Sequence, residues 1–570
     1  MKMEEVKEIG GQILEVLLLY LGEARVKVND LCAGLEAWQV IALSVGVTLI
    51  TVWFINFLFH PLYSLKDRIK ATVFRIVRSL PPVKKYIKKQ LDETIVSMSK
   101  HAFALEAGDH YIKSLPAKGS TEDEVIARIN KKYKTLDKVD WAGGKVSGTV
   151  YSGTDDLSRL CARVYEDFAW SNPLHVDVFP SVRRMEAEVI AMCLKMFNGG
   201  QRSCGVMTSG GTESILMAVL AARQIAYARG VEYPEIIAGD SVHAAFDKAA
   251  FYYRMKLIHV PVDPITRKVN VKAMRKKINK NTCMLVGSAP CFNAGVIDPI
   301  EDIAKLGVKY NIPVHVDCCL GGFIVPFLKK AGFDVPPFDF MVKGVTSISA
   351  DTHKYGFAPK GSSVILYSDR KYRENQFFVA PDWTGGIYAT STIAGSRAGA
   401  IIAACWATLM YIGEEGYVKS TKQIVDTAKY IEDGCRKIPG IYVMGKPDTS
   451  VVAIASNDID IFRLYGDLTK CGWSLNSLQF PSSFHLCVTI RQCADGVADE
   501  FLQDVRTCAA EIMKNPSEKA SGSAALYGAS QGIPDRSLVT DISKAYLDVW
   551  FSTDVYDEND KVKVEANGTH

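Results

Sequence analysis

The stretch SISADTHKYG, residues 347–356, carries a His-Lys pair at the end of a run of small and polar residues. The run is typical of a strand end, so Thr352, His353 and Lys354 would follow the carboxyl end of a strand. Ligands gather at such ends in sheets built from parallel strands. A lysine at a sheet edge is usually only solvated, so a functional role for the His-Lys pair depends on the segments that precede it.

Short apolar runs separated by helical patterns surround this stretch. Between residues 150 and 367 the runs lie at 235–238, 257–260, 284–287, 313–316 and 364–367. This alternation predicts an α/β fold, in which helices cover both faces of a mostly parallel sheet.

The chain has 570 residues, more than one hydrophobic core normally organises, so we expect several parts. We place a large domain at residues 150–400 and a smaller C-terminal α+β domain at residues 401–515. A basic, helical N-terminal segment is expected at residues 61–149. Residues 516–570 are rich in small and polar side chains, which predicts a flexible tail.

A membrane span is predicted at residues 38–60. No Asp, Glu, Lys or Arg lies between Glu36 and Lys66, and a helix here would be apolar all round and could cross about 30 Å of hydrocarbon. Nine lysines and arginines fall within residues 66–89, against four before the span. The positive-inside rule therefore makes the span a signal-anchor, with residues 1–37 lumenal and the rest of the chain cytosolic. The sequon that begins at Asn567 would then stay unglycosylated.

The composition excludes some classes of partner and site. The formal net charge is +4, from 67 basic and 63 acidic residues, so nothing in it favours nucleic acid. The 14 cysteines form no C-x-x-C pair, and we predict no metal site.

Two segments upstream of the His-Lys pair carry further chemistry. The stretch TSGGTES, residues 208–214, opens a helical run, and glycines there expose backbone N–H groups that can bind phosphate. Asp317 ends an apolar run, where a carboxylate can pair with a pyridinium nitrogen. Either segment alone could equally be the start of a capped helix.

Taken in order, the three segments resemble those of the fold-type I pyridoxal 5'-phosphate (PLP) enzymes, most closely the branch that includes glutamate decarboxylase and sphingosine-1-phosphate lyase. The resemblance implies the PLP-dependent transferase fold, with PLP held by Lys354 as a Schiff base. It implies that Asp317 binds the pyridine nitrogen and that His243 stacks on the ring. The residues implied to contact the cofactor phosphate are Gly210, Gly211, Thr212, Thr352 and His353.

Within that branch, the single span makes the chain similar to the sphingosine-1-phosphate lyases of the endoplasmic reticulum. The resemblance implies a membrane-anchored homodimer that cleaves sphingoid base phosphates by a retro-aldol reaction, giving a long-chain aldehyde and phosphoethanolamine. The base that takes the C3 hydroxyl proton stays open among Lys354, Tyr388 and a phosphate oxygen. The candidates for the substrate phosphate are Tyr151, Asn172, His175 and Lys360.

Two other functions are compatible with the residues. An amino-acid decarboxylase would need a cation for the substrate's α-carboxylate, and Arg397 could supply it. A membrane-anchored scaffold could keep the fold without catalysis, although the presence of all three segments argues against that alternative.

Overall fold

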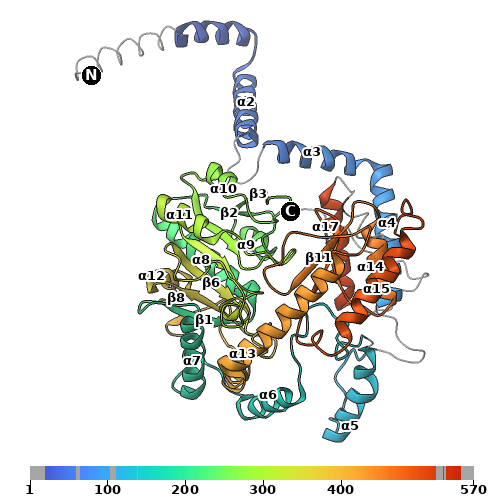
Figure 1. The fold of residues 1–570 in the computed structure, drawn as a ribbon. Helices are drawn as coiled ribbons and strands as arrows, with labels where there is room; N and C mark the ends of the chain where they lie inside the picture. The colour runs from blue at the N-terminus through green and yellow to red at the C-terminus, as the bar shows by residue number, and fades with distance from the viewer. Residues whose placement is uncertain are drawn as a thin grey trace. The chain divides into compact units, whose positions relative to one another are not determined.

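The computed structural model describes residues 20–58, 65–102, 111–137, 139–520, 531 and 535–553. The chain divides into two compact units, residues 1–85 and 86–570. Each unit is described by itself, and Figure 1 shows the elements of both.

The first unit is helical in its described residues. Residues 20–32 form a helix, followed by α2 (Ala37–Leu58), α3 (Leu65–Ser79) and the beginning of α4 (Pro81–Ala102). The segment Ala37–Ile55 of α2 is long and apolar enough to cross a membrane, and none of it is buried inside the protein. α2 covers residues 38–58 of the predicted span, whereas residues 59 and 60, and residues 1–19, lie outside the described residues.

A seven-stranded sheet forms the centre of the second unit, in the order β1-β7-β6-β5-β4-β2-β3. β6, β5, β4, β2 and β3 run parallel, while β7 is antiparallel to both of its neighbours, so β1 points the same way as β6. The predicted mostly parallel sheet is confirmed. The strands are β1 (Cys204–Thr208), β2 (Glu235–Gly239), β3 (Lys256–Val260), β4 (Thr282–Ser288), β5 (Val314–Asp317), β6 (Val345–Ala350) and β7 (Ser363–Tyr367).

Helices cover both faces of this sheet, as predicted. Successive side chains of a strand point to opposite faces, so alternate strand residues pack into two separate cores. In β7, Val364 and Leu366 belong to one core, whereas Ile365 and Tyr367 belong to the other. The first core includes residues of α7, α10, α11 and α13, and the second includes residues of α8 and α9. The helices of this region are α6 (Asp155–Phe168), α7 (Pro180–Met196), α8 (Gly211–Ala228), α9 (Ala245–Tyr252), α10 (Val271–Lys277), α11 (Ile300–Tyr310) and α12 (Arg370–Arg373).

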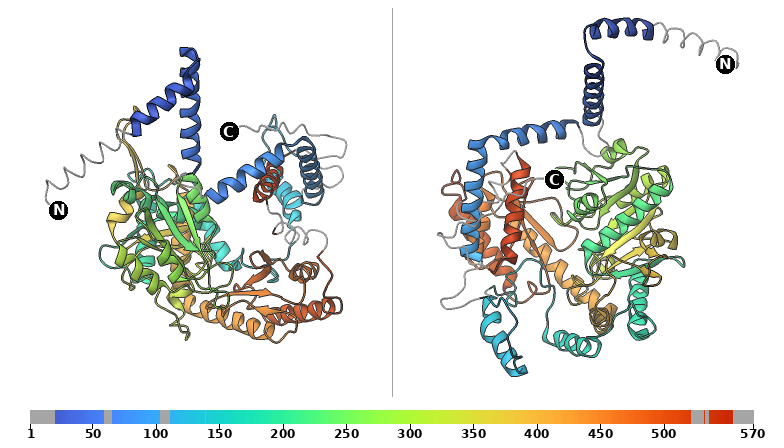
Figure 2. Two further views of the ribbon diagram at one scale, coloured as in Figure 1. Left: turned by 90° about the horizontal axis from the view of Figure 1, so that it is seen from above. Right: turned by 180° about the vertical axis from the view of Figure 1, so that it is seen from behind.

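The smaller C-terminal part is an α+β domain, as predicted. Its four strands form an antiparallel sheet in the order β10-β11-β13-β12. The long helix α13 (Gly399–Cys435) leads into it from the large sheet, as both views of Figure 2 show, and changes direction at Gly413. The other elements are β10 (Tyr442–Val443), β11 (Val451–Ala455), α14 (Ile461–Lys470), β12 (Asn476–Leu478), β13 (Ser483–Cys487) and α15 (Val497–Ile512).

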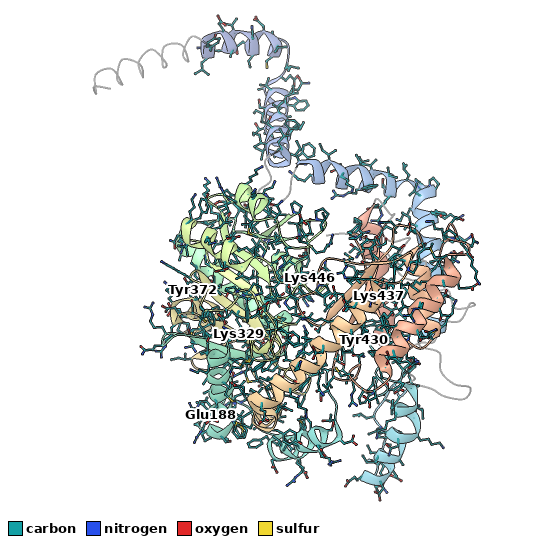
Figure 3. The ribbon with its side chains drawn as sticks, viewed as in Figure 1. Glu188, Lys329, Tyr372, Tyr430, Lys437 and Lys446 are labelled. Carbon is teal, nitrogen blue, oxygen red and sulfur yellow. The ribbon has the colours of Figure 1, made fainter. Side chains whose placement is uncertain are left out.

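Side chains on α13 join the two parts of the second unit. Near its beginning, the indole of Trp406 donates to Glu188 on α7 at 2.8 Å. Near its end, the hydroxyl of Tyr430 donates to Asp499 on α15. Figure 3 labels Glu188, on α7, and Tyr430, near the end of α13, and shows them well apart. α13 therefore connects the large sheet and the C-terminal domain through side-chain contacts with both.

Two predicted boundaries need correction. The N-terminal segment was expected to be helical up to residue 149, but residues 144–149 lie in extended and turn backbone against the C-terminal domain. The side-chain amide of Gln492 donates there to the carbonyls of Gly144 and Val146.

The tail was expected to be flexible from residue 516, yet α17 (Arg536–Phe551) is helical, with Asp535 as its cap. A composition rich in small residues before α17 concealed its apolar periodicity.

The remaining elements are short or peripheral. They comprise α5 (Glu122–Arg128), a π-helical turn (Ile129–Tyr133), 3-10 turns at Lys134–Leu136, Val325–Phe327 and Glu374–Gln376, and the two-stranded hairpin of β8 (Phe378–Ala380) and β9 (Tyr388–Thr390).

Candidate active site

The sheet brings the three sequence segments to one edge. Asp317 at the end of β5 stands opposite Ser288 of β4 and Ser349 of β6. Because β1 points the same way as β6, its last residue, Thr208, reaches the same edge opposite Ser363 of β7. The loops that carry Lys354, Asp317, the glycines after β1, and His243 after β2 all leave from this edge.

Lys354 forms an ion pair with Asp351 in the turn that follows β6. Its Nζ lies 2.8 Å from Oδ2 of Asp351, whose side chain is 2% exposed, against 23% for Lys354. Burial, the largest single effect, would lower the pKa of Lys354, but the charge and hydrogen bond of Asp351 act together with Cys319 and Tyr151 to raise that pKa. The other oxygen, Asp351 Oδ1, is buried without a hydrogen-bond partner among the described residues.

The N-terminus of α8 packs directly against this ion pair. A Cβ on Gly211 would lie 2.7 Å from Oδ2 of Asp351 and 2.7 Å from Sγ of Cys319, so no side chain fits there. A Cβ on Gly210 would lie 3.4 Å from the His353 ring. The first backbone N–H groups of a helix have no partner within that helix and lie at the positive end of its dipole. A helix start whose free N–H groups suit an anion therefore lies beside Lys354.

Thr352 and His353 are fixed by the turn that precedes β7. Thr352 Oγ1 donates to Ser362 Oγ at 2.7 Å, and the backbone N–H of Ser362 donates to Nδ1 of His353 at 3.3 Å. With Nδ1 as acceptor, the proton of a neutral His353 lies on Nε2, which is 3.7 Å from Asp351. Burial lowers the pKa of His353, so its ring is mostly uncharged at neutral pH.

A chain of hydrogen bonds orients Asp317. Its Oδ1 accepts from the backbone N–H of Cys319 at 3.0 Å and from Ser349 Oγ at 3.3 Å. His315 lies between Ser347 and Ser349, with ring nitrogens 2.9 Å and 3.1 Å from the two hydroxyls. Burial lowers the pKa of His315 to about 4, so this ring is neutral and adds no positive charge beside Asp317.

His243 lies in the loop between β2 and α9. Its Nδ1 accepts from the backbone N–H of Ala245 at 3.1 Å, and its ring is exposed. The ring centroid is 6.3 Å from that of Phe292, which follows β4. An aromatic face is thus available at the edge of the sheet that carries Asp317 and Lys354.

Two of the four candidates for the substrate phosphate lie beside Lys354. Lys360 Nζ is 5.0 Å from the Tyr151 ring centroid and 3.5 Å from the carbonyl oxygen of His353. Tyr151 is buried, and the charges of Lys354 and Asp351 both act on its hydroxyl. Burial, as the largest effect, raises the pKa of Tyr151, which therefore stays protonated.

The other two candidates lie in a different turn. Asn172 donates to Ser396 at 3.1 Å and accepts from the backbone N–H of Arg397 at 3.2 Å. His175, in the same turn, is exposed, and its backbone N–H donates to the carbonyl of Asn172. No described contact joins these residues to Lys354 or Lys360. Tyr388 likewise lies elsewhere, in β9, where its ring packs near Phe378 and Trp383.

Arg397 is bound to a carboxylate of the protein itself. Its NH1 and NH2 groups donate to the two oxygens of Glu186 at 2.6 Å and 2.8 Å, and both side chains are less than one-fifth exposed. A bidentate pair of this kind uses the geometry that would otherwise hold a substrate carboxylate. Arg397 is therefore not free to bind the α-carboxylate of an amino acid, as a decarboxylase would need.

The sequence analysis missed Asp351 and Cys319. Cys319 lies among Asp317, Ser349 and the start of α8, and donates to Ser349 Oγ at 3.2 Å. A signal was present for Asp351, because a residue three positions before a lysine in a tight turn can reach its ammonium group. The signal for Cys319 was its position two residues after Asp317, where its N–H caps the carboxylate.

These residues fit PLP. The cofactor needs an amine for its aldehyde, an anion for its ring nitrogen and donors for its phosphate. The sheet edge offers Lys354, the buried Asp317 carboxylate and the glycine-lined start of α8. Oδ1 of Asp351, buried there, has no hydrogen-bond partner among the described residues and can still accept one hydrogen bond. Each requirement is met by a described residue at the same edge.

Known proteins similar in sequence or structure also indicate a PLP-dependent protein. Residues 113–455 match the family model of the pyridoxal-dependent decarboxylase conserved domain. The chain is 50% identical to sphingosine-1-phosphate lyase 1 of Rattus norvegicus, covering 95% of each chain. It is 48% identical to sphingosine-1-phosphate lyase of Drosophila melanogaster, covering 92% of this chain and 96% of that one. A solved sphingosine-1-phosphate lyase of Burkholderia pseudomallei superposes with a TM-score of 0.72 at 36% identity, covering 78% of this chain and 98% of the other.

Proposed function

Because the chain belongs to the pyridoxal-dependent decarboxylase family, and within it to the sphingosine-1-phosphate lyases, we propose that it cleaves phosphorylated sphingoid bases. The chain is a PLP-dependent carbon–carbon lyase, and its products are a long-chain aldehyde and phosphoethanolamine. The single observation that carries this function is the meeting of Lys354, Asp317 and the start of α8 at one sheet edge.

Lys354 is the residue that would hold PLP covalently. Its amine must lose a proton before it can bond to an aldehyde carbon. Asp351 would accept or guide that proton, since it already holds the Nζ at 2.8 Å. Gly210, Gly211 and Thr212 would present backbone N–H groups to the cofactor phosphate, and Thr352 and His353 would approach it from the turn between β6 and β7.

Asp317 and His243 would control the cofactor ring. When bound, PLP supplies an electron sink for the bond next to the amine-bearing carbon of the substrate. Asp317 would keep the ring nitrogen protonated, because its carboxylate is buried and its orientation is fixed by Cys319 and Ser349. His243 would cover one ring face.

Lys360 and Tyr151 would receive the polar end of the substrate. A phosphate dianion needs a cation and hydrogen-bond donors, and the Lys360 amine lies over the ring of Tyr151, whose hydroxyl keeps its proton. Asn172 and His175 remain secondary candidates, supported by their polar side chains alone. Tyr388 remains a candidate base on the family resemblance alone, since its described ring contacts are with Phe378 and Trp383.

The membrane placement follows from α2 and from the substrate. A long-chain base phosphate partitions into bilayers, so an enzyme anchored there meets its substrate within two dimensions. We propose that α2 crosses the endoplasmic reticulum membrane once, with the N-terminus lumenal and the second unit cytosolic, and that the enzyme works as a homodimer.

The function is tested by incubating the purified full-length chain, loaded with PLP, with a sphingoid base phosphate. Release of a long-chain aldehyde and phosphoethanolamine in equal amounts is expected, and the Lys354→Ala variant should release neither. Carbon dioxide release from an amino acid, without aldehyde from the lipid, would instead establish a decarboxylase. Absence of both reactions, together with no uptake of PLP, would establish a scaffold.

A further inference from the structure

Helix α3 carries two kinds of side chain on separate faces. Residues 65, 69, 73 and 76 follow one another at spacings of three or four, so they fall on one side of the helix, and residue 80 comes directly after its last residue, Ser79, at the same spacing. They are all apolar and all exposed: Leu65 39%, Ile69 48%, Val73 51%, Ile76 59% and Leu80 48%. This row of residues is called the apolar stripe of α3 below.

The rest of α3 is strongly basic. Residues 65–79 contain five lysines and arginines and a single acidic residue, Asp67. By helical spacing, Arg75 and Arg78 fall toward the side opposite the stripe, while Arg68 and Lys70 flank the stripe on its two sides. Lys70 Nζ lies 5.8 Å from the ring centroid of Phe74, so its chain runs along the helix surface. A helix with this charge complements a surface that combines hydrocarbon with anionic groups.

The position of α3 in the chain places it at such a surface. Only residues 59–64 separate it from α2, and six residues span at most about 21 Å. Cα atoms of α2 and α3 within this unit approach to within 8 Å. α3 also runs across the direction of α2 rather than continuing it, as Figure 1 shows. If α2 crosses the bilayer, α3 begins at the headgroup level and runs along it.

We propose that α3 lies in the plane of the cytosolic membrane surface, with its apolar stripe among the acyl chains and its basic residues against anionic phospholipid headgroups. The inference rests on the proposed membrane span of α2 and goes beyond it, since a span alone needs no second lipid contact. α3 would fix the start of the cytosolic chain at the depth at which a lipid substrate presents its headgroup, and would make that attachment sensitive to the charge of the membrane.

The placement is tested by photo-crosslinking of the full-length chain in nanodiscs. A benzophenone amino acid replaces Val73 in the apolar stripe, Arg75 on the opposite face or Leu49 in α2, in three separate proteins. Lipid adducts are expected at Val73 and Leu49 and should be several-fold fewer at Arg75. Adducts at Leu49 with none at Val73 would overturn the proposal for α3 and leave the span intact. Absence of adducts at Leu49 would overturn the span, and the proposal for α3 with it.

The charge dependence is tested with a matched pair of variants. Crosslinking at Val73 should rise several-fold when phosphatidylserine is added to phosphatidylcholine nanodiscs. Combining Lys70→Glu with Arg75→Glu should abolish that rise. Combining Lys272→Glu with Lys276→Glu, at two exposed positions of α10, makes the same change in net charge and should leave the rise intact. Equal crosslinking in both lipids for the unaltered chain would overturn the assignment of anionic headgroups.

Discussion

The Nζ of Lys354 lies 2.8 Å from Oδ2 of Asp351, directly beside the first turn of α8. A buried carboxylate therefore holds the lysine in its charged form beside the helix start that we propose to bind the cofactor phosphate. The pair links the proposed covalent and anion-binding functions of the site, and specific predictions follow from it.

Replacing the carboxylate should change the pH at which Lys354 reacts. The Asp351 charge raises the pKa of Lys354 against the opposing effect of burial, so Asp351→Asn should let burial lower that pKa. The uncharged amine would then be present at lower pH. The rate at which the cofactor-free enzyme takes up PLP, followed by absorbance across a pH series, should reach half its maximum at a lower pH than in the unaltered enzyme.

A control for this variant is Asp247→Asn, which removes an exposed carboxylate that pairs with His259. That change should leave the pH dependence of PLP uptake as it is. An unchanged midpoint in Asp351→Asn would show that Asp351 does not govern the charge of Lys354.

Gly211 should tolerate no side chain. The Cβ of Gly211→Ala would lie 2.7 Å from the Asp351 carboxylate and from Cys319 Sγ, and overpacking of this kind costs about 1–3 kcal/mol. If the start of α8 gives way at this cost in binding, the dissociation constant for PLP should rise about 5- to 150-fold. Equilibrium dialysis of the folded variant measures it. Gly200→Ala is the matched control, because nothing lies within 4 Å of its Cβ.

Lys360 should act on substrate affinity and not on the cofactor. A charge-assisted hydrogen bond to the substrate phosphate contributes about 1.5–3 kcal/mol, so Lys360→Met should raise KM for a sphingoid base phosphate about 10- to 100-fold. The visible absorbance of bound PLP should stay unchanged. A variant with unaltered KM would move the phosphate site to Asn172 and His175.

Stability should fall in mild acid because two buried histidines are held neutral. Burial lowers the pKa of His315 and of His485 from 6.5 to about 4. Between these values the unfolded chain binds more protons than the folded one, so the free energy of unfolding decreases as pH falls, by about 1.4 kcal/mol per pH unit for each histidine.

The variant His485→Leu isolates one of these contributions. Its urea midpoint should fall less than that of the unaltered enzyme when the pH is lowered from about 7 to about 5, because one of the two titrating groups is gone. Equal losses in both proteins would show that His485 does not titrate in this range.

The sheet could be predicted from the sequence because parallel strands buried on both faces are continuous apolar runs. Four of the five predicted runs fall within β2, β3, β4 and β7, and the fifth, 313–316, begins one residue before β5. The packing of residues 144–149 on the C-terminal domain could not be predicted, since it joins segments that lie more than 300 residues apart. The residues around Gly144 and Val146 give no indication that Gln492 is their hydrogen-bond partner.

The site was predictable where a motif has a fixed order along the chain. Lys354, Asp317 and the two glycines follow strand ends, and strand ends of one direction meet at one edge. The close approach of Gly211 to Asp351 and Cys319 brings three separate segments together, and spacing in a sequence carries no information about such an approach. The pairing of Arg397 with Glu186, 211 residues apart, was hidden for the same reason.

The most direct measurement of the central claim is the absorbance and turnover of Lys354→Ala. If Lys354 holds the cofactor, the dialysed variant should lose the near-visible absorbance of covalently bound PLP and release no aldehyde from a sphingoid base phosphate, while circular dichroism shows an intact fold. A folded Lys354→Ala protein that keeps both the absorbance after dialysis and aldehyde release would contradict the account.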